Sequence, residues 1–143
     1  MTETVKPRPS FRNIHITQIV SYRLPPAGIV SILHRVSGFL MFLLLPFIIW
    51  MFDTSLTSEI SYGQFTSVFA GGIGPVPGLF FKLVVLALIW AYLHHFMAGL
   101  RHLWMDVSHD AVTKEFGKRS ALLTLVLSLG LTVVLGAKLF GLY

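Results

Sequence analysis

The sequence contains no cysteine and few charged residues. The absence of cysteine among the 143 residues excludes disulfides, thiolate metal sites, iron–sulfur ligation and the covalent attachment of c-type haem. Charged residues make up 12% of the chain, roughly half of the ~25% typical of soluble domains, whereas hydrophobic residues make up 55%. This composition largely excludes a water-soluble enzyme domain. Histidine is therefore the strongest ligand that the chain offers to a metal or cofactor.

Three long stretches of the chain have almost no charge. A helix needs about 20 predominantly apolar residues to cross a bilayer. Residues 36–52 and 121–137 carry no charged side chain, and residues 79–100 carry only Lys82. Together with their flanking helix signals, these stretches predict an all-α membrane protein with three transmembrane helices, at about residues 27–52, 79–104 and 120–142.

Proline and glycine mark the ends of these stretches. Pro25 and Pro26 precede the first span and favour a helix start there. Pro46 lies inside the same span, where we expect a kink but no break, because neighbouring helices can satisfy the freed backbone groups. The glycine- and proline-rich residues 71–78 lead into the second span. The loop before them has helical spacing that indicates a short interfacial helix, with Phe65, Val68 and Phe69 on one face. Residues 13–22 mix two periodicities and leave their structure open.

Lysine and arginine are absent from residues 36–81. Outside the spans, the cations gather at Lys6, Arg8, Arg12, Arg23 and Arg35 before the first stretch and at Lys114, Lys118 and Arg119 in the last loop. Because positive loops stay inside, the N-terminus should be cytoplasmic and the C-terminus periplasmic in a bacterial inner membrane. We expect a cytoplasmic segment, residues 1–26, followed by a multi-pass anchor in the bilayer, residues 27–143. This distribution indicates topology and not nucleic-acid binding, and the long polar leader does not match a cleavable signal peptide.

Polar residues cluster toward the cytoplasmic ends of the first two spans. His95 lies nine residues before Trp104, about 13 Å deep, and His34 lies about 10 Å past Ala27. Ionisable groups inside a membrane are costly and are functional candidates by default. Arg35, Arg101 and His102 could instead extend to the lipid headgroups, as long side chains near helix ends do. His95 is too short and too deep for that, which leaves a ligand or a hydrogen-bonded packing residue.

Helical spacing sorts these residues by face. His95, Gly99 and His102 share one stripe of the second span, at i, i+4 and i+7. His94 points about 100° away, on the side of Arg101. On the first span, the shared face carries Ser31, Arg35 and Gly38, with His34 on its flank. The two glycines either admit a flat macrocycle or simply allow close helix packing.

This set of residues suits two kinds of ligand. A haem needs an axial imidazole, which His95 can supply, and cations for its propionates, which His34, Arg35, Arg101 and His102 can supply. A quinone needs hydrogen-bond donors and a positive charge as it is reduced, roles that fit Ser31 and Arg35. Asp106 is either a proton donor to that site or an ordinary residue just outside the membrane.

Two motifs resemble a known family. Residues 31–38 match S-x-x-H-R-x-[ST]-G, and residues 95–106 match H-x-x-x-G-x-R-H-x-x-x-D. Both are similar to the cytochrome b subunit of succinate dehydrogenase, respiratory complex II. The likeness extends over the three spans, to Arg8 and Pro9 near the N-terminus and to residues 117–120 before the third span.

The resemblance implies an electron-transfer role. The chain would be the larger of two small membrane anchors that dock an iron–sulfur subunit and a flavoprotein subunit on the cytoplasmic face. One b-type haem, shared with the second anchor, would have His95 as an axial ligand and the other histidine from that partner. Ser31 and Arg35 would line the ubiquinone site, and His34, Arg35 and His102 would lie near the propionates. The spacing to Gly99 selects His95 over the adjacent His94.

Several alternatives remain open on the sequence. The same anchor in a quinol:fumarate reductase would carry electrons in the reverse direction. A proton-coupled transporter subunit would use the histidines as a relay, although three spans without a repeat or an intramembrane carboxylate argue against it. A structural anchor without a cofactor would leave the matching depths of His34 and His95 unexplained. A haem held by His34 and His95 of this one chain is a further alternative.

Overall fold

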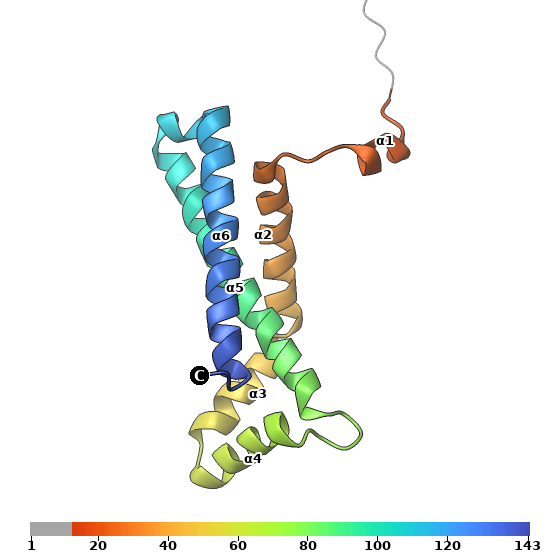
Figure 1. The fold of residues 1–143 in the computed structure, drawn as a ribbon, viewed down its shortest axis with the longest axis vertical. Coiled ribbons are helices and arrows are strands. Elements are labelled where there is room, and N and C mark those ends of the chain that lie inside the picture. Colours follow the sequence, from red (N-terminus) through yellow and green to blue (C-terminus); the bar gives the residue numbers. More distant parts are fainter. Residues whose placement is uncertain (1–12) are drawn as a thin grey trace, which may run out of the picture.

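The computed structural model describes residues 13–143, and the N-terminal charges and Arg8-Pro9 lie outside this range. The described chain is helical, in the order α1 (Ile16–Ser21), α2 (Pro26–Leu43), α3 (Leu45–Leu56), α4 (Glu59–Ala70), α5 (Gly78–Val107), the short 3-10 helix η1 (His109–Val112) and α6 (Lys114–Leu139). Figure 1 shows α2, α5 and α6 side by side, with α3 and α4 at one end and η1 at the other. The segment that the sequence left open contains α1.

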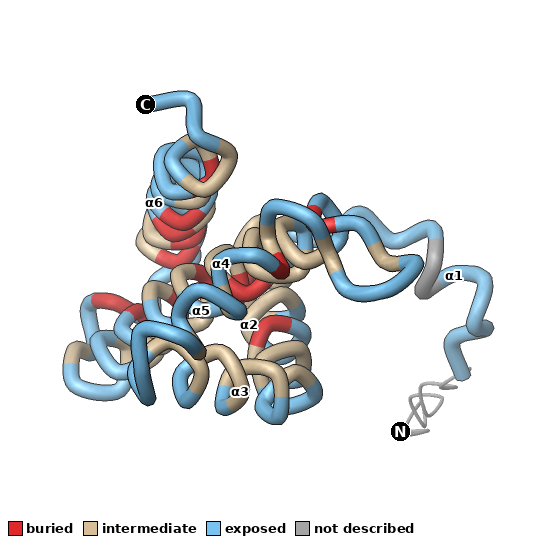
Figure 2. Tube along the Cα trace, turned by 90° about the horizontal axis from the view of Figure 1, so that it is seen from below, coloured by how far each residue is buried: buried red, intermediate tan, exposed pale blue. Residues whose placement is uncertain are grey.

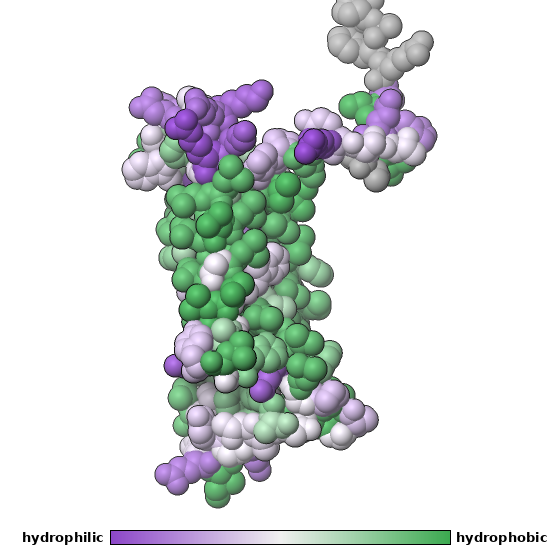
Figure 3. Space-filling view, in the orientation of Figure 1, coloured by the Kyte–Doolittle hydropathy of each residue, from purple (hydrophilic) through white to green (hydrophobic). Residues whose placement is uncertain are grey.

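Three helices are long and apolar enough to cross a membrane. They are α2, α5 and α6, with 18, 30 and 26 residues. Their side chains form a hydrophobic band between two more polar ends in Figure 3. This arrangement confirms the predicted all-α fold with three transmembrane helices.

The first predicted span is two helices. The sequence predicts one kinked helix over residues 27–52, whereas α2 ends at Leu43 and α3 begins at Leu45. Leu44 adopts φ −90° and ψ 7°, outside the helical region. Pro46 explains the break, because it has no N–H to donate to the carbonyl of Phe42 and its ring crowds that group. The neighbouring helices do not restore the helix here, and α3 turns away from the bundle toward α4 (Figure 1).

The second span is longer than predicted at both ends, and the third begins six residues before its predicted start and ends at Leu139, three residues before its predicted end. α5 continues to Val107 and therefore includes Asp106 in its last turn. α6 begins at Lys114 because the side chain of Thr113 accepts a hydrogen bond from the backbone N–H of Phe116 and caps the helix. Most of the predicted loop between the second and third spans is thus helical, and only η1 and its flanking residues separate α5 from α6.

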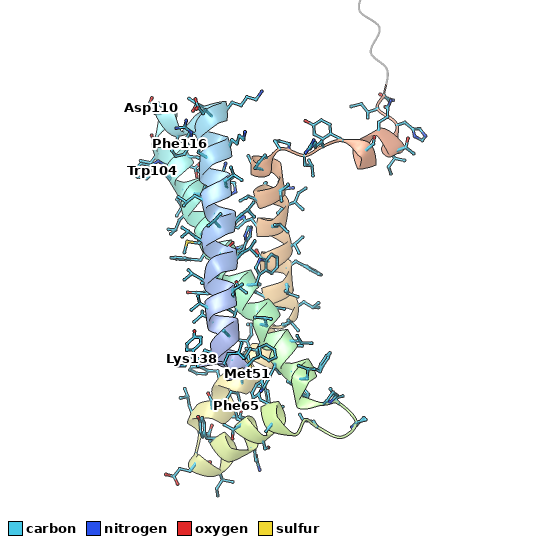
Figure 4. All side chains as sticks on the ribbon, in the orientation of Figure 1. Met51, Phe65, Trp104, Asp110, Phe116 and Lys138 are labelled. Atoms are coloured by element: carbon cyan, nitrogen blue, oxygen red, sulfur yellow. The ribbon has the colours of Figure 1, made fainter. Side chains whose placement is uncertain are left out.

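A short helix, α4, follows the first span. Ser58 and Ser61 form a reciprocal capping box at its start. Phe65 packs against Trp50 of α3 and Phe69 of α4, with ring centroids 6.4 and 5.0 Å away, and Val68 is buried. In Figure 4, Phe65, Met51 and Lys138 lie at the end opposite Trp104, Asp110 and Phe116.

Small residues let the helices approach closely. Ala91 and Ala98 of α5 and Ala121 and Ser128 of α6 are fully buried, and Figure 2 shows buried positions recurring along these helices. A β-carbon at Gly136 would lie 2.7 Å from a methyl carbon of Leu86. Close backbone approach of this kind is how membrane helices gain packing energy when lipid is as apolar as leucine. α5 is therefore held rigidly between α2 and α6, and its polar side chains face fixed neighbours.

Candidate functional site

The adjacent histidines of α5 face different helices. The imidazole of His95 points to α2, where Nδ1 lies 3.0 Å from the carbonyl oxygen of His34 and 3.3 Å from the hydroxyl of Ser37. His94 is fully buried against α6, with Nδ1 3.2 Å from the hydroxyl of Ser128. A helix turns 100° per residue, so these consecutive side chains point to different sides of α5.

Three histidines meet between α2 and α5. The rings of His34 and His95 stack with centroids 4.1 Å apart and an interplanar angle of 21°. The ring of His102 lies 5.3 Å from that of His34, tilted by 46°. All three are partly exposed. We call His34, His95 and His102 the histidine cluster; it unites residues that the sequence placed at similar depth on two helices.

The hydrogen bonds of His95 select one tautomer of the neutral ring. A carbonyl oxygen can only accept, so Nδ1 of His95 must carry the hydrogen that it donates to His34. Ser37, which is fully buried, donates its own hydrogen to the same carbonyl over 2.9 Å and can share the imidazole hydrogen through its oxygen. Nε2 of His95 makes no hydrogen bond to any residue in the described part of the chain, and in the neutral tautomer it is the nitrogen with the lone pair. This is the tautomer in which the imidazole can bind a metal through Nε2.

Glycines give the cluster its room. A β-carbon at Gly38 would lie 2.9 Å from Cε1 and 3.2 Å from Nδ1 of His95, closer than such contacts allow. A β-carbon at Gly99 would lie 3.8 Å from Nε2 of His34, an ordinary contact. Gly38 therefore serves the close packing of His95 against α2, whereas Gly99 is less constrained.

The other predicted residues of α2 and α5 lie around the cluster. Ser31 is half-buried and Arg35 is exposed, one residue beyond His34. Neither side chain forms a hydrogen bond within residues 13–143, so both are available to an external ligand. Asp106 is exposed in the last turn of α5, one helical turn beyond His102. The role of Asp106 in proton delivery stays a prediction.

The structure does not bring Arg101 to the cluster. Its guanidinium faces α6, where Nε donates to the hydroxyl of Ser120 at 3.0 Å and Nη2 donates to the carbonyl of Gly117 at 3.3 Å. The side chain is 9% exposed. The face of α5 that carries His94 and Arg101 meets α6 at Ser128, Ser120 and Gly117, and its Ala98 also packs against Val30 of α2.

Sequence reasoning did not assign a role to Ser37 or Ser128. Each lies opposite one of the two histidines and supplies a hydroxyl within hydrogen-bond distance. The sequence did contain a signal for both serines, since Ser37 follows His34 by three residues and Ser128 is one of few hydroxyl residues in an uncharged run.

The second ring nitrogen of His94, Nε2, has no hydrogen-bond partner in the part of the chain described. The His94 ring stacks on Trp90, with the ring centroids 5.6 Å apart.

Comparison with known proteins gives concordant similarities. A family described as the succinate dehydrogenase/fumarate reductase transmembrane subunit matches residues 7–135. The succinate dehydrogenase cytochrome b556 subunit of Coxiella burnetii is 30% identical over 118 residues, covering 82% of this chain and 89% of the relative. The subunit of the same name from Paracoccus denitrificans is 28% identical over 99 residues, covering 69% of this chain and 71% of the relative.

Replacing Gly38 with alanine should disturb the histidine cluster. The added methyl group would overlap the His95 ring, and overpacking of this kind typically costs about 1–3 kcal/mol. We expect Gly38→Ala to lower the thermal unfolding temperature of the purified protein in detergent. Gly130→Ala is the matched control, because a β-carbon at Gly130 meets nothing within 4 Å. Equal stability of the two variants would contradict the close contact between Gly38 and His95.

Proposed function

This chain belongs to the succinate dehydrogenase/fumarate reductase transmembrane subunit family, and we propose that it anchors a succinate:ubiquinone oxidoreductase, binds b-type haem and forms part of the quinone-reduction site. It is a multi-pass protein of the bacterial inner membrane, and its relatives are subunits of an oxidoreductase complex. The observation that carries the proposal is the imidazole of His95, held through Nδ1 by α2 with Nε2 free.

The residues around His95 fit a haem. An axial histidine commonly donates its second ring nitrogen to a backbone carbonyl, which orients the ring and strengthens it as a ligand. The carbonyl of His34 does this for His95, and the hydroxyl of Ser37 supports it. The cytochrome b556 names of the relatives agree with an iron-bound porphyrin. When bound, such a group accepts and donates single electrons.

A second axial ligand would come from another chain. Two imidazoles that held one iron would lie on either side of it and would not stack on each other. His34 and His95 stack at 4.1 Å, which argues against a haem held by this pair. We therefore assign the second histidine to a partner membrane anchor and give His34 another role.

Cations around the cluster would hold the acidic arms of the porphyrin. His34, His102 and Arg35 come from two helices and lie toward the end of the bundle where α5 terminates. Charge-assisted hydrogen bonds to carboxylates are about twice as strong as neutral ones. Arg101 was predicted among these partners, but its guanidinium is bonded to α6, so it takes no part in this proposal.

Quinone reduction would use the free polar groups of α2. Ser31 would donate a hydrogen bond to one carbonyl oxygen, and Arg35 would stabilise the negative charge that develops there on reduction. Both are available because neither is bonded within the described chain. Asp106, exposed near the same end, would supply protons. An iron–sulfur subunit and a flavoprotein subunit would deliver the electrons from succinate, since this chain has no cysteine to hold clusters.

The alternative functions differ in their support. The family description includes fumarate reductase, which would reverse the electron flow through the same residues. The names of the two relatives favour succinate oxidation. A histidine relay in a transporter has no comparable support, because neither the family nor the two relatives are described as transporters.

The two adjacent histidines provide a direct test of ligation. We expect His95→Ala to abolish the reduced b-type absorption band of purified membranes, because the axial ligand is lost. His94→Ala is the matched control; it should retain the band, although it removes a buried hydrogen bond to Ser128. Loss of the band in His94→Ala with retention in His95→Ala would reverse the ligand assignment.

A substitution of Arg35 can distinguish an effect on quinone reduction from an effect on succinate oxidation. Removing the cation should slow quinone reduction by about 10²- to 10³-fold, the usual effect of losing one group that stabilises an oxyanion. Succinate oxidation with an artificial acceptor should be largely unchanged in Arg35→Ala. Equal loss of both activities would show failed assembly in place of a damaged quinone site.

Membrane orientation can be tested because the chain has no cysteine. The positive-inside rule places the end of the bundle with η1 and Lys118 in the cytoplasm. A single cysteine in Lys118→Cys should react with a membrane-impermeant thiol reagent only in inverted vesicles. Thr57→Cys, beyond α3, is the matched position on the other side and should react only in right-side-out vesicles. The opposite pattern would invert the proposed topology.

A further inference from the structure

Arg101 is a buried cation without a carboxylate partner. Its side chain is 9% exposed and bonds only to a hydroxyl and a backbone carbonyl, both neutral. The one ion pair found within residues 13–143 joins Arg119 to Glu115 on the surface. Burying an arginine with neutral partners satisfies its hydrogen bonds in part but leaves its charge uncompensated. The uncompensated positive charge of Arg101 therefore favours the binding of an anion beside it.

A cavity of about 340 Å³ borders Arg101 on the side of α2. It lies between the start of α2, the end of α5 and the start of α6. Lys114 and Lys118 of α6 line it together with Arg101, and no aspartate or glutamate does. Pro26, Met105 and Val112 supply apolar walls. Three cations in an otherwise apolar pocket suit a ligand that is both anionic and amphiphilic.

The cavity lies at the level of the membrane surface. Arg101 precedes the end of α5 by six residues, or about 9 Å along the helix. Trp104, one turn closer to the end, is 60% exposed, as expected of an aromatic residue at the headgroup level. Trp104, Phe116 and Asp110 mark this end in Figure 4, and Figure 3 shows the polar surface beginning there.

We propose that this pocket binds the phosphate headgroup of an anionic phospholipid, with Arg101, Lys114 and Lys118 around the phosphate. Basic pockets between transmembrane helices bind such headgroups. The first turn of α6 adds a favourable partial charge, because unpaired backbone N–H groups gather at a helix N-terminus. Lipid is favoured over a free anion because it is the anion concentrated at this depth and because the walls are apolar. The site is independent of the haem and quinone roles proposed above.

An apolar groove offers room for acyl chains near the same arginine. It has a volume of about 310 Å³ and lies between α5 and α6. Arg101 and Ser120 border it, and its other walls include Leu100, Leu123 and Leu127. The guanidinium thus lies beside both a charged pocket and a hydrocarbon-lined groove, which is the environment of a lipid phosphate.

The test measures lipid retained by the whole purified complex. Delipidated complex would be titrated with phosphatidylglycerol or phosphatidylcholine, and the bound lipid counted by native mass spectrometry. We expect preferential binding of phosphatidylglycerol. The double variant Lys114→Gln/Lys118→Gln should bind it about 30-fold more weakly, since each basic residue near an anionic headgroup contributes on the order of fivefold. Arg119→Gln is the matched control, an exposed cation of the same helix that does not line the pocket.

Four results would overturn the proposal. The first is equal binding of the two lipids by the wild-type complex. The second is an equal loss in the double variant and in Arg119→Gln, which would indicate general surface attraction. The third is full competition by millimolar inorganic phosphate, which would indicate a free-anion site. The fourth is carbodiimide cross-linking of Lys114 or Lys118 to a partner subunit, which would show a protein carboxylate in the pocket.

Discussion

The structure depends on how α5 satisfies two adjacent imidazoles inside a membrane. No water is present in the bilayer core to complete their hydrogen bonds, so each ring must find a partner within the protein. His95 finds the carbonyl of His34 and the hydroxyl of Ser37 on α2, and His94 finds the hydroxyl of Ser128 on α6. These contacts fix the rotation of α5 relative to both neighbours. A rotation of α5 by one residue would break both of these pairings.

The two faces of α5 consequently have different properties. Toward α6, Ala91, His94, Ala98 and Arg101 are all buried, and they meet small residues that allow tight packing. Toward α2, the histidine cluster remains partly exposed and carries polar groups with unused hydrogen-bonding capacity. The face toward α2 offers unused donors and lone pairs to a cofactor or a partner, whereas the face toward α6 is buried and leaves Nε2 of His94 without a hydrogen-bond partner among the described residues. The chain therefore presents its cofactor candidates on the face that it does not complete itself.

The local sequence pattern predicted much of this arrangement, but it missed the features that depend on contacts with neighbouring helices. Composition and run length predicted the three spans, and the 100° step separated His94 from His95. The break at Leu44 was missed because it depends on whether a neighbouring helix satisfies the carbonyl of Phe42, which a single segment does not reveal. The position of Arg101 was predicted on the side of His94, yet its charge was still assigned to the propionates. Only the contacts with Ser120 and Gly117 show that α6 holds the guanidinium.

The spacing between His95 and Arg101 places their side chains on different sides of α5. They are six residues apart, a rotation of about 240° around a helix with 3.6 residues per turn. Arg101 therefore points away from the histidine cluster while remaining about 9 Å nearer the end of α5. Its place against α6 separates its charge from that of Arg35, which lies beside the histidine cluster. The positive charge at this end of the bundle is thus divided between a face toward α2 and a face toward α6.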